Sequence, residues 1–235
     1  MFGVERRTPN GDRLPMNTRS IIAKTKDYIR TRLSGECTGH DWFHTERVWR
    51  VANYLSSREG GDSAVVQLAA LLHDIADWKF HDGNHSLGAK LADEWLSLCD
   101  VSNPIRHRVC HIVEVISFKG AGHTEKPSDV EGKIVQDSDR LDAIGAIGIA
   151  RAFAYGGFRG QPIYDPAKTP AAHRDFEAYK KASTTTINHF YEKLLLLAER
   201  MNTQTAREMA RRRHDYLRNF LQEFMLEWNF DSPNE

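Results

Sequence analysis

Two histidines and several aspartates stand where helices would carry polar side chains into an apolar interior. The segment Leu71-Leu72-His73-Asp74 ends an almost uninterrupted apolar run that begins at Ala64. Burying an unpaired carboxylate costs several kcal/mol, so buried ionisable groups usually pair with one another or bind a metal. This run therefore predicts a buried helix that delivers a histidine and a carboxylate to the protein interior, where both need a partner.

Two other expected helices supply further candidate ligands. His44 lies on the inward stripe at the N-terminal end of the preceding helix, and Asp137, Asp139 and Asp142 form a polar patch in a later, largely apolar one. Two imidazoles and two carboxylates, with room for two waters, form a mixed nitrogen and oxygen site for one divalent metal ion. Such a site suits Mn²⁺, Fe²⁺, Co²⁺ or Ni²⁺ better than Mg²⁺, which prefers oxygen ligands.

The order of these residues resembles a known family. His44, the adjacent His73-Asp74 and the distant Asp139 match the H…HD…D signature of the HD superfamily of metal-dependent phosphohydrolases. The resemblance covers nearly everything after residue 18 and looks like the bacterial YedJ/YpgQ-type subgroup. The stretches that carry it are 40–48, 116–120 and 136–148.

The resemblance implies a helical fold in which those four residues bind the metal. It also implies that a metal-activated water hydrolyses a phosphate ester or anhydride. The expected substrate is a phosphorylated small molecule, in particular a nucleotide such as a (deoxy)nucleoside triphosphate cleaved by a pyrophosphohydrolase. Two alternatives stay open: a cyclic-nucleotide or alarmone phosphodiesterase, and a catalytically silent nucleotide-binding regulatory module.

Three aspartates compete for the fourth ligand position. Asp139 matches the small-Asp-Arg-Leu pattern of the family and is therefore the expected ligand. Asp137 points about 200° away from Asp139 on an ideal helical wheel, so the two are not expected to face one metal. Asp142 follows Asp139 by one turn and is a candidate for orienting a ligand or a water.

A proton carrier and several substrate contacts are expected beside the metal. Asp77 follows the ligand Asp74 by three residues, hence on the same helical face, and matches the place where some HD nucleotidases carry an acidic catalytic residue. Asp74 and Asp77 are therefore the expected catalytic residues. Cationic side chains near the motif would bind the phosphate groups of the substrate. The aromatic residues of the loop at 155–171 would either stack on the base or only pack the loop against the protein. The substrate-binding candidates are Arg47, Lys79, Lys119, Tyr155 and Arg159, with Phe158 and Tyr164 as further aromatic residues of that loop.

Other histidines are weaker candidates for a second metal. We expect them to face solvent or to lie in loops, with His111 the strongest exception because its helix should border the site. They are His81, His85, His107, His111 and His123.

Helices alone are expected to position this site. Apolar residues recur at helical spacing along most of the chain, and no strand pair stands out. Asp62 or Ser63 is expected to cap the central helix, and Ser128 with Glu131 forms a capping-box pattern. The expected elements are a helix ending near Ser34, helices after Trp42, at 64–72, from Ser86 and from Asn103, one helix behind Ser128 that runs to Ala154, a loop at 155–171, and two long helices at about 173–201 and 203–228.

The sequence as a whole favours one all-α HD domain in a protein of the cytoplasm. Residues 1–16 are expected to form a disordered leader, and 17–230 the domain, with a metal-site core at about 38–155 and C-terminal helices at about 172–228. The charge of zero, from 32 basic and 32 acidic residues, gives a nucleic-acid partner no overall support. No stretch approaches the roughly 18 apolar residues that span a bilayer, and three dispersed cysteines fit no disulfide framework.

The last expected helix has two distinct faces. Arginines at 207, 211, 212, 213 and 218 alternate with acidic residues, which indicates a solvated face with ion pairs. The apolar residues between Phe220 and Trp228 belong either to the core or to a homodimer interface.

Overall fold

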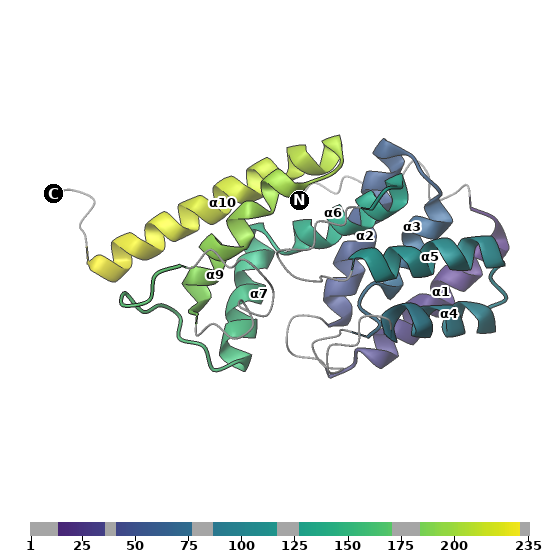
Figure 1. The fold of residues 1–235 in the computed structure, drawn as a ribbon, viewed down its shortest axis with the longest axis horizontal. Helices are drawn as coiled ribbons and strands as arrows, with labels where there is room; N and C mark the ends of the chain where they lie inside the picture. The colour runs from purple at the N-terminus through teal and green to yellow at the C-terminus, as the bar shows by residue number, and fades with distance from the viewer. Residues whose placement is uncertain (1–13, 36–40, 77–86, 117–126, 171–183, 231–235) are drawn as a thin grey trace, which may run out of the picture. The chain divides into compact units, whose positions relative to one another are not determined.

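The computed structural model describes residues 14–35, 41–76, 87–116, 127–170 and 184–230, and within these ranges it contains helices and no strands (Figure 1). The all-α prediction is confirmed. The expected leader lies almost entirely outside the described residues, and the first helix begins at Met16. Among the helices that are described, none combines the length and the apolar character needed to cross a membrane.

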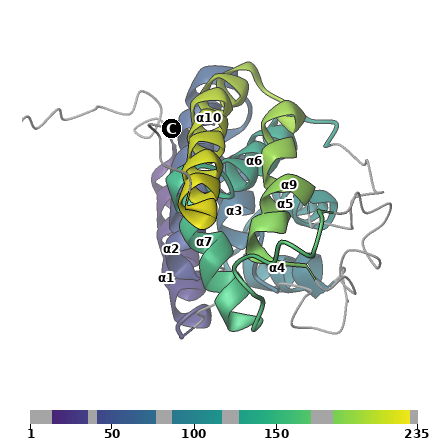
Figure 2. The same ribbon diagram turned by 90° about the vertical axis from the view of Figure 1, so that its left-hand side faces the viewer.

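The described residues form two compact units, and the first is built around α3. This helix packs against α1, α2 and α5, while α4 and α5 lie side by side (Figures 1 and 2). Every residue of α3 after Ser63 is buried, so the apolar run is the core of this unit, as predicted. The unit contains α1 (Met16–Arg32), α2 (Trp42–Glu59), α3 (Ser63–Leu72), α4 (Leu87–Leu98), α5 (Asn103–Ile116) and α6 (Val130–Asp142) as far as Ser138.

The second unit continues from Asp139 and is built around an aromatic cluster. In it α7 packs against α9 and α10 (Figure 2). The ring of Phe220 lies 5.9 Å from that of Phe153 and 5.7 Å from that of Phe190, so this part of the α10 stripe serves the core. The elements are α7 (Gly145–Phe158), α9 (Thr186–Glu192), the 3₁₀ turns η3 (Leu194–Leu196) and η4 (Ala198–Arg200), and α10 (Gln204–Asn229).

Two expected boundaries are wrong. The helix expected to run to Ala154 is broken: α6 ends at Asp142 and α7 begins at Gly145. Gly145 has a φ of +77°, a conformation that residues with a Cβ rarely adopt, and apolar periodicity does not reveal such a turn. The expected loop at 155–171 starts later, because α7 continues through Phe158.

The two expected C-terminal helices differ in outcome. α10 matches the second one closely. Of the first, the described part is only the seven-residue α9 followed by two 3₁₀ turns, and residues 171–183 lie outside the described ranges. The 3₁₀ turns interrupt the α-helical hydrogen bonding that the continuous apolar pattern predicted.

The arginines of α10 do not all face solvent. Arg207, Arg211, Arg212 and Arg218 are exposed, as predicted for a solvated face, whereas Arg213 is half-buried. Arg207 also donates hydrogen bonds to the Met201 and Asn202 carbonyls, and Arg213 donates one to a carbonyl of α6. These two side chains satisfy main-chain acceptors at helix ends, a role that charge alternation does not indicate.

Candidate metal centre

Three side chains from three helices meet around one point. His44 on α2, His73 at the end of α3 and Asp139 on α6 each offer a ligand atom, and these atoms all lie within 4.8 Å of one another. His44 is fully buried and His73 is only 6% exposed. Asp139 directly follows Ser138 within the continuous helix α6, so the backbone of that helix carries it to the cluster.

Asp74 lies beside the two histidines of this group. Its Oδ2 lies 3.3 Å from His44 Nε2 and 3.4 Å from His73 Nε2, and the two Nε2 atoms are 3.3 Å apart. Donors that bind one octahedral ion at about 2.1 Å lie about 3 Å from each other when they are neighbours. The spacing of these three atoms is close to that value, so the donor set fits a single divalent ion.

The last turn of α3 orients the ring of His73. The carbonyl oxygen of Ala70 lies 2.9 Å from His73 Nδ1, and because a carbonyl only accepts, Nδ1 must carry the hydrogen. In the neutral ring this leaves the lone pair on Nε2, the atom that faces His44 and Asp74. Such a hydrogen bond to the second ring nitrogen is typical of metal-binding histidines.

The other two aspartates of the α6 patch lie outside this cluster. Asp137 is fully buried, two residues from Asp139 and therefore on another side of the helix. Asp142 is buried as well, and its Oδ2 accepts a hydrogen bond from Arg151 Nη1 at 3.1 Å. Asp142 therefore has an ion pair with α7 where the sequence suggested a role beside a ligand or a water.

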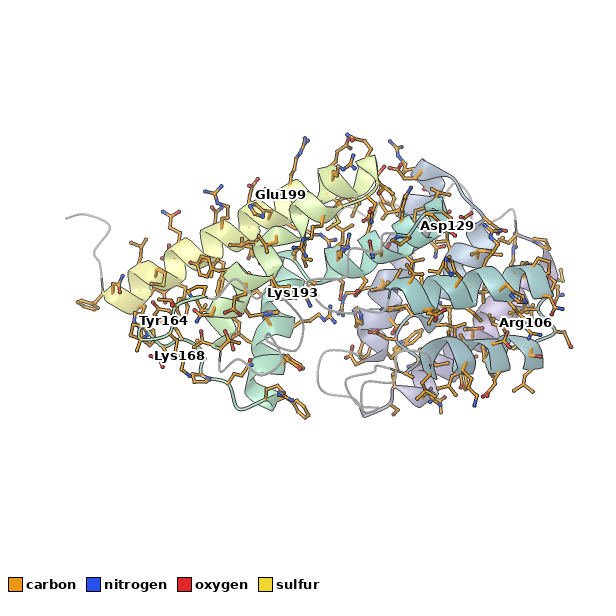
Figure 3. The ribbon with its side chains drawn as sticks, viewed as in Figure 1. Arg106, Asp129, Tyr164, Lys168, Lys193 and Glu199 are labelled. Atoms are coloured by element: carbon orange, nitrogen blue, oxygen red, sulfur yellow. The ribbon has the colours of Figure 1, made fainter. Side chains whose placement is uncertain are left out.

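The remaining site candidates are only partly described. Arg47 is half-buried on α2, one turn after His44, while Tyr155 is half-buried on α7 and Arg159 is exposed just after it. Tyr164 packs edge-on against Phe224 and Trp228 of α10, so its ring has an anchoring role (Figure 3). Asp77, Lys79 and Lys119 lie outside the described residues.

The histidines considered for a second metal do not join the cluster where they are described. His107 and His111 are both exposed on α5, so the exception proposed for His111 is not supported. His81, His85 and His123 lie outside the described ranges.

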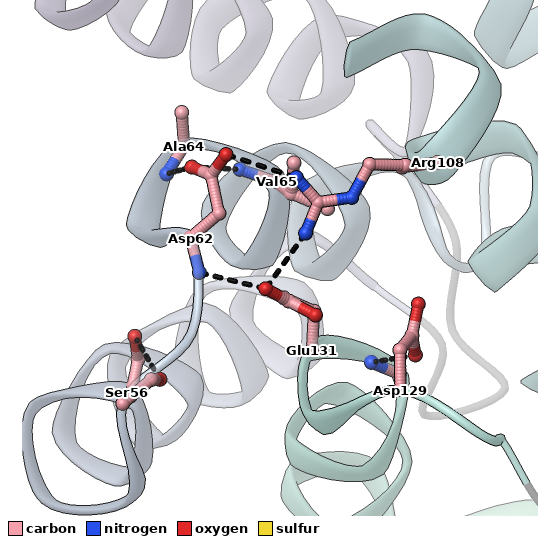
Figure 4. A network of polar contacts seen from close by, with 9 residues as sticks. Ser56, Asp62, Ala64, Val65, Arg108, Asp129 and Glu131 are labelled. Carbon is pink, nitrogen blue, oxygen red and sulfur yellow. Dashed lines mark hydrogen bonds and ion pairs between the residues drawn. The ribbon is translucent and has the colours of Figure 1, made fainter. Parts of the chain in front are cut away.

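A polar network joins the N-terminal ends of the two helices that carry His73 and Asp139 (Figure 4). Asp62 caps α3 by accepting from Ala64 N–H at 3.0 Å, as predicted. Glu131, in the first turn of α6, accepts from Asp62 N–H and from Arg108 Nη2, each at 2.7 Å. Arg108 also donates to Asp62 at 3.1 Å, so one guanidinium on α5 bridges both carboxylates.

The capping box predicted for α6 is absent from this end of the helix. Asp129, rather than Ser128, accepts the Gly132 N–H at 2.9 Å, and Glu131 reaches Asp62. Burial opposes ionisation of Glu131, but the hydrogen bonds from backbone N–H groups and the Arg108 charge outweigh it and lower its pKa. The ionised carboxylate therefore links the N-terminal ends of α3 and α6, while the candidate ligands His73 and Asp139 lie toward the C-terminal ends of these helices.

Glu131→Gln is expected to reduce the free energy of unfolding by about 1–3 kcal/mol at pH 7, because it removes a buried charge-assisted acceptor. The folded pKa of Glu131 is lowered, so its stabilisation is present above the unfolded value, about 4.3, and is lost as the pH falls through the folded pKa. Urea denaturation at pH 7 and near pH 3.5 measures both effects. Glu114→Gln, at an exposed position on α5, is the control, and a difference that stays constant with pH would contradict the assignment.

Comparison with known proteins shows to which family this chain belongs. The family model of the HD domain matches residues 42–144, which include His44, His73, Asp74 and Asp139. The chain belongs to the HD-domain family, and HD-superfamily hydrolases are among its structural neighbours.

Particular relatives extend this similarity to most of the chain. YpgQ, an uncharacterized protein of Bacillus subtilis, is 38% identical over 199 residues, covering 84% of this chain and 89% of YpgQ. A crystal structure from Lactobacillus plantarum has a TM-score of 0.80 at 37% identity and covers 90% of this chain and 98% of its own. The crystal structure of YpgQ in complex with ADP has a TM-score of 0.68 at 33% identity, with coverages of 91% and 98%.

Proposed function

We propose that this protein is a metal-dependent phosphohydrolase that cleaves a phosphate ester or anhydride of a nucleotide, with (deoxy)nucleoside triphosphates as the first substrates to test. The observation that carries this proposal is the cluster of possible ligand atoms from His44, His73 and Asp139, with Asp74 Oδ2 within 3.4 Å of both histidines. Two buried imidazole nitrogens and a carboxylate oxygen within 3.4 Å of one another form a donor set that a divalent cation can bind.

The donor set also supports a choice of metal. Two imidazole nitrogens among the four ligands favour Mn²⁺, Fe²⁺, Co²⁺ or Ni²⁺ over Mg²⁺. When bound, the ion would act as a Lewis acid that polarises a phosphoryl oxygen and lowers the pKa of a water. The protein would hold it with His44, His73, Asp74 and Asp139.

The remaining steps fall to side chains around the site. Asp77 takes up the proton of the attacking water, and Asp74 keeps its position as a ligand beside it. Arg47, Lys79 and Lys119 hold the phosphate groups through charge-assisted hydrogen bonds. Tyr155 and Arg159 contact the base.

The nucleotide as substrate class is supported by a relative. YpgQ of Bacillus subtilis has been crystallised in complex with ADP, and the present chain matches that protein along most of its length. Adenine nucleotides are therefore the first members of the substrate panel.

Metal-free protein supplied with Mn²⁺, Co²⁺, Ni²⁺ or Mg²⁺ and a panel of phosphorylated compounds tests the proposal. The panel holds nucleoside mono-, di- and triphosphates together with cyclic nucleotides, and both phosphate and pyrophosphate are measured. Turnover of a nucleoside phosphate that needs the metal and stops with a chelator is the expected result. Turnover of cyclic nucleotides alone would make the protein a phosphodiesterase, and no turnover with tight nucleotide binding would make it a binding module.

A further inference from the structure

The three residues that follow Asp139 are each tied to a different element of the second unit. Arg140 Nη1 donates to the carbonyl of Arg200 in η4. The carbonyl of Leu141 accepts from Arg213 Nη1 of α10. Asp142 accepts from Arg151 Nη1 of α7 at 3.1 Å. The last turn of α6, which carries Asp139, is therefore held by contacts from three other elements.

Arg213 donates a hydrogen bond to the Leu141 carbonyl, which has only a weak acceptor interaction within the backbone. The last carbonyls of a helix have no intrahelical N–H partner, and α6 stops at Asp142. Within the backbone, Leu141 O receives only a long contact of 3.4 Å from Ile144 N–H. A guanidinium at this end also complements the partial negative charge of the helix C-terminus.

The side chain of Arg213 packs closely against Gly145, in the turn between α6 and α7. A Cβ added to Gly145 would lie 3.1 Å from Arg213 Cγ and 3.2 Å from its Cβ, so the arginine stem occupies the space that a side chain there would need. Burial lowers the pKa of Arg213, and the nearby carboxylate of Asp142 opposes that shift. Asp142 itself is only 3% exposed. Arg213 is thus packed against the helix end and faces a buried carboxylate.

We propose that Arg213 is a positioning residue for Asp139: it anchors the final turn of α6 and so fixes the orientation of the carboxylate that this turn carries. This inference rests on the proposed metal site. It makes α10 necessary for tight metal binding although its contact is with the backbone of α6 rather than with a ligand. Removal of a partner that hydrogen-bonds a metal ligand changes metal affinity by about 10- to 100-fold, and we expect the lower end of that range for Arg213, which acts through the backbone.

Arg213→Met tests the proposal, since methionine keeps much of the stem volume and removes the donor and the charge. Arg212→Met, at the neighbouring exposed position of α10, is the matched control. Titration of the metal-free proteins with Mn²⁺ by calorimetry gives the Kd, and thermal unfolding of the same metal-free samples gives the stability. We expect the Kd of Arg213→Met to rise about 10-fold or more over that of the control, at a temperature where both are folded.

The outcomes separate this inference from the proposed function. Wild-type protein that binds no metal would overturn both. Wild-type binding with an equal Kd in folded Arg213→Met and Arg212→Met would overturn the positioning role alone, even if the thermal midpoint fell. If Arg213→Met does not fold, Asp142→Asn, which preserves shape while removing the charge that Arg151 and Arg213 face, decides by the same comparison of Kd.

Discussion

Replacing His73 by alanine is expected to abolish stoichiometric metal binding and to lower phosphohydrolase activity by about 10³-fold or more. The substitution removes the Nε2 atom that lies 3.3 Å from His44 Nε2 and 3.4 Å from Asp74 Oδ2. A divalent ion contributes several kcal/mol to the stabilisation of the transition state in such reactions, and each 1.36 kcal/mol is about tenfold in rate. Metal content by elemental analysis and turnover of the best substrate measure the two effects.

His107→Ala is the control for this experiment. His107 is exposed on α5 and does not belong to the cluster of possible ligands. Its replacement should leave both metal content and turnover at the wild-type level. His73→Ala protein that retains one equivalent of metal would remove His73 from the ligand set and would leave the proposed centre without its best-oriented imidazole.

Asp77→Asn is expected to lower kcat by about 10²- to 10⁴-fold while metal content stays at one equivalent. An amide keeps the size of the carboxyl group but cannot take up a proton, so only the proton-transfer step should suffer. Steady-state kinetics between pH 5 and 9, together with metal analysis of the same samples, measure these effects.

Asp27→Asn provides the matched comparison, because Asp27 is exposed on α1 and outside the ligand cluster. A kcat for Asp77→Asn equal to that of this control would exclude Asp77 from proton transfer. Loss of metal from Asp77→Asn would also contradict the proposed role, because it would make the carboxylate a ligand.

The cluster of possible metal ligands could be anticipated because its signals are local. The apolar run of α3 predicts burial from residue types alone, and His73 and Asp74 follow it directly. His44 lies on the apolar stripe of α2, so helical periodicity is enough to bury it. The resemblance to HD phosphohydrolases then selected Asp139 from three neighbouring aspartates, which the residues alone had not resolved.

The contacts that hold these helices in place could not be anticipated in the same way. Glu131 accepts from Asp62, 69 positions away, where the local pattern predicted a capping box with Ser128. Arg213 donates to Leu141, 72 positions away, from a helix whose charge pattern predicted only solvent exposure. Gly145 breaks the helix that the apolar residues between 143 and 154 had predicted to be continuous.

The distinction has a physical origin. The periodicity of apolar residues indicates which side of a single helix is buried. The free-energy cost of burying a charge indicates that a group such as His73-Asp74 needs an interaction partner. These two principles, with the family motif, were sufficient to predict an all-helical fold and the cluster of candidate ligands. The choice of partner depends on how separate helices pack. Only the tertiary structure therefore decided that Arg108 bridges Asp62 and Glu131, that Asp142 pairs with Arg151, and that Arg213 closes the end of the helix that carries Asp139.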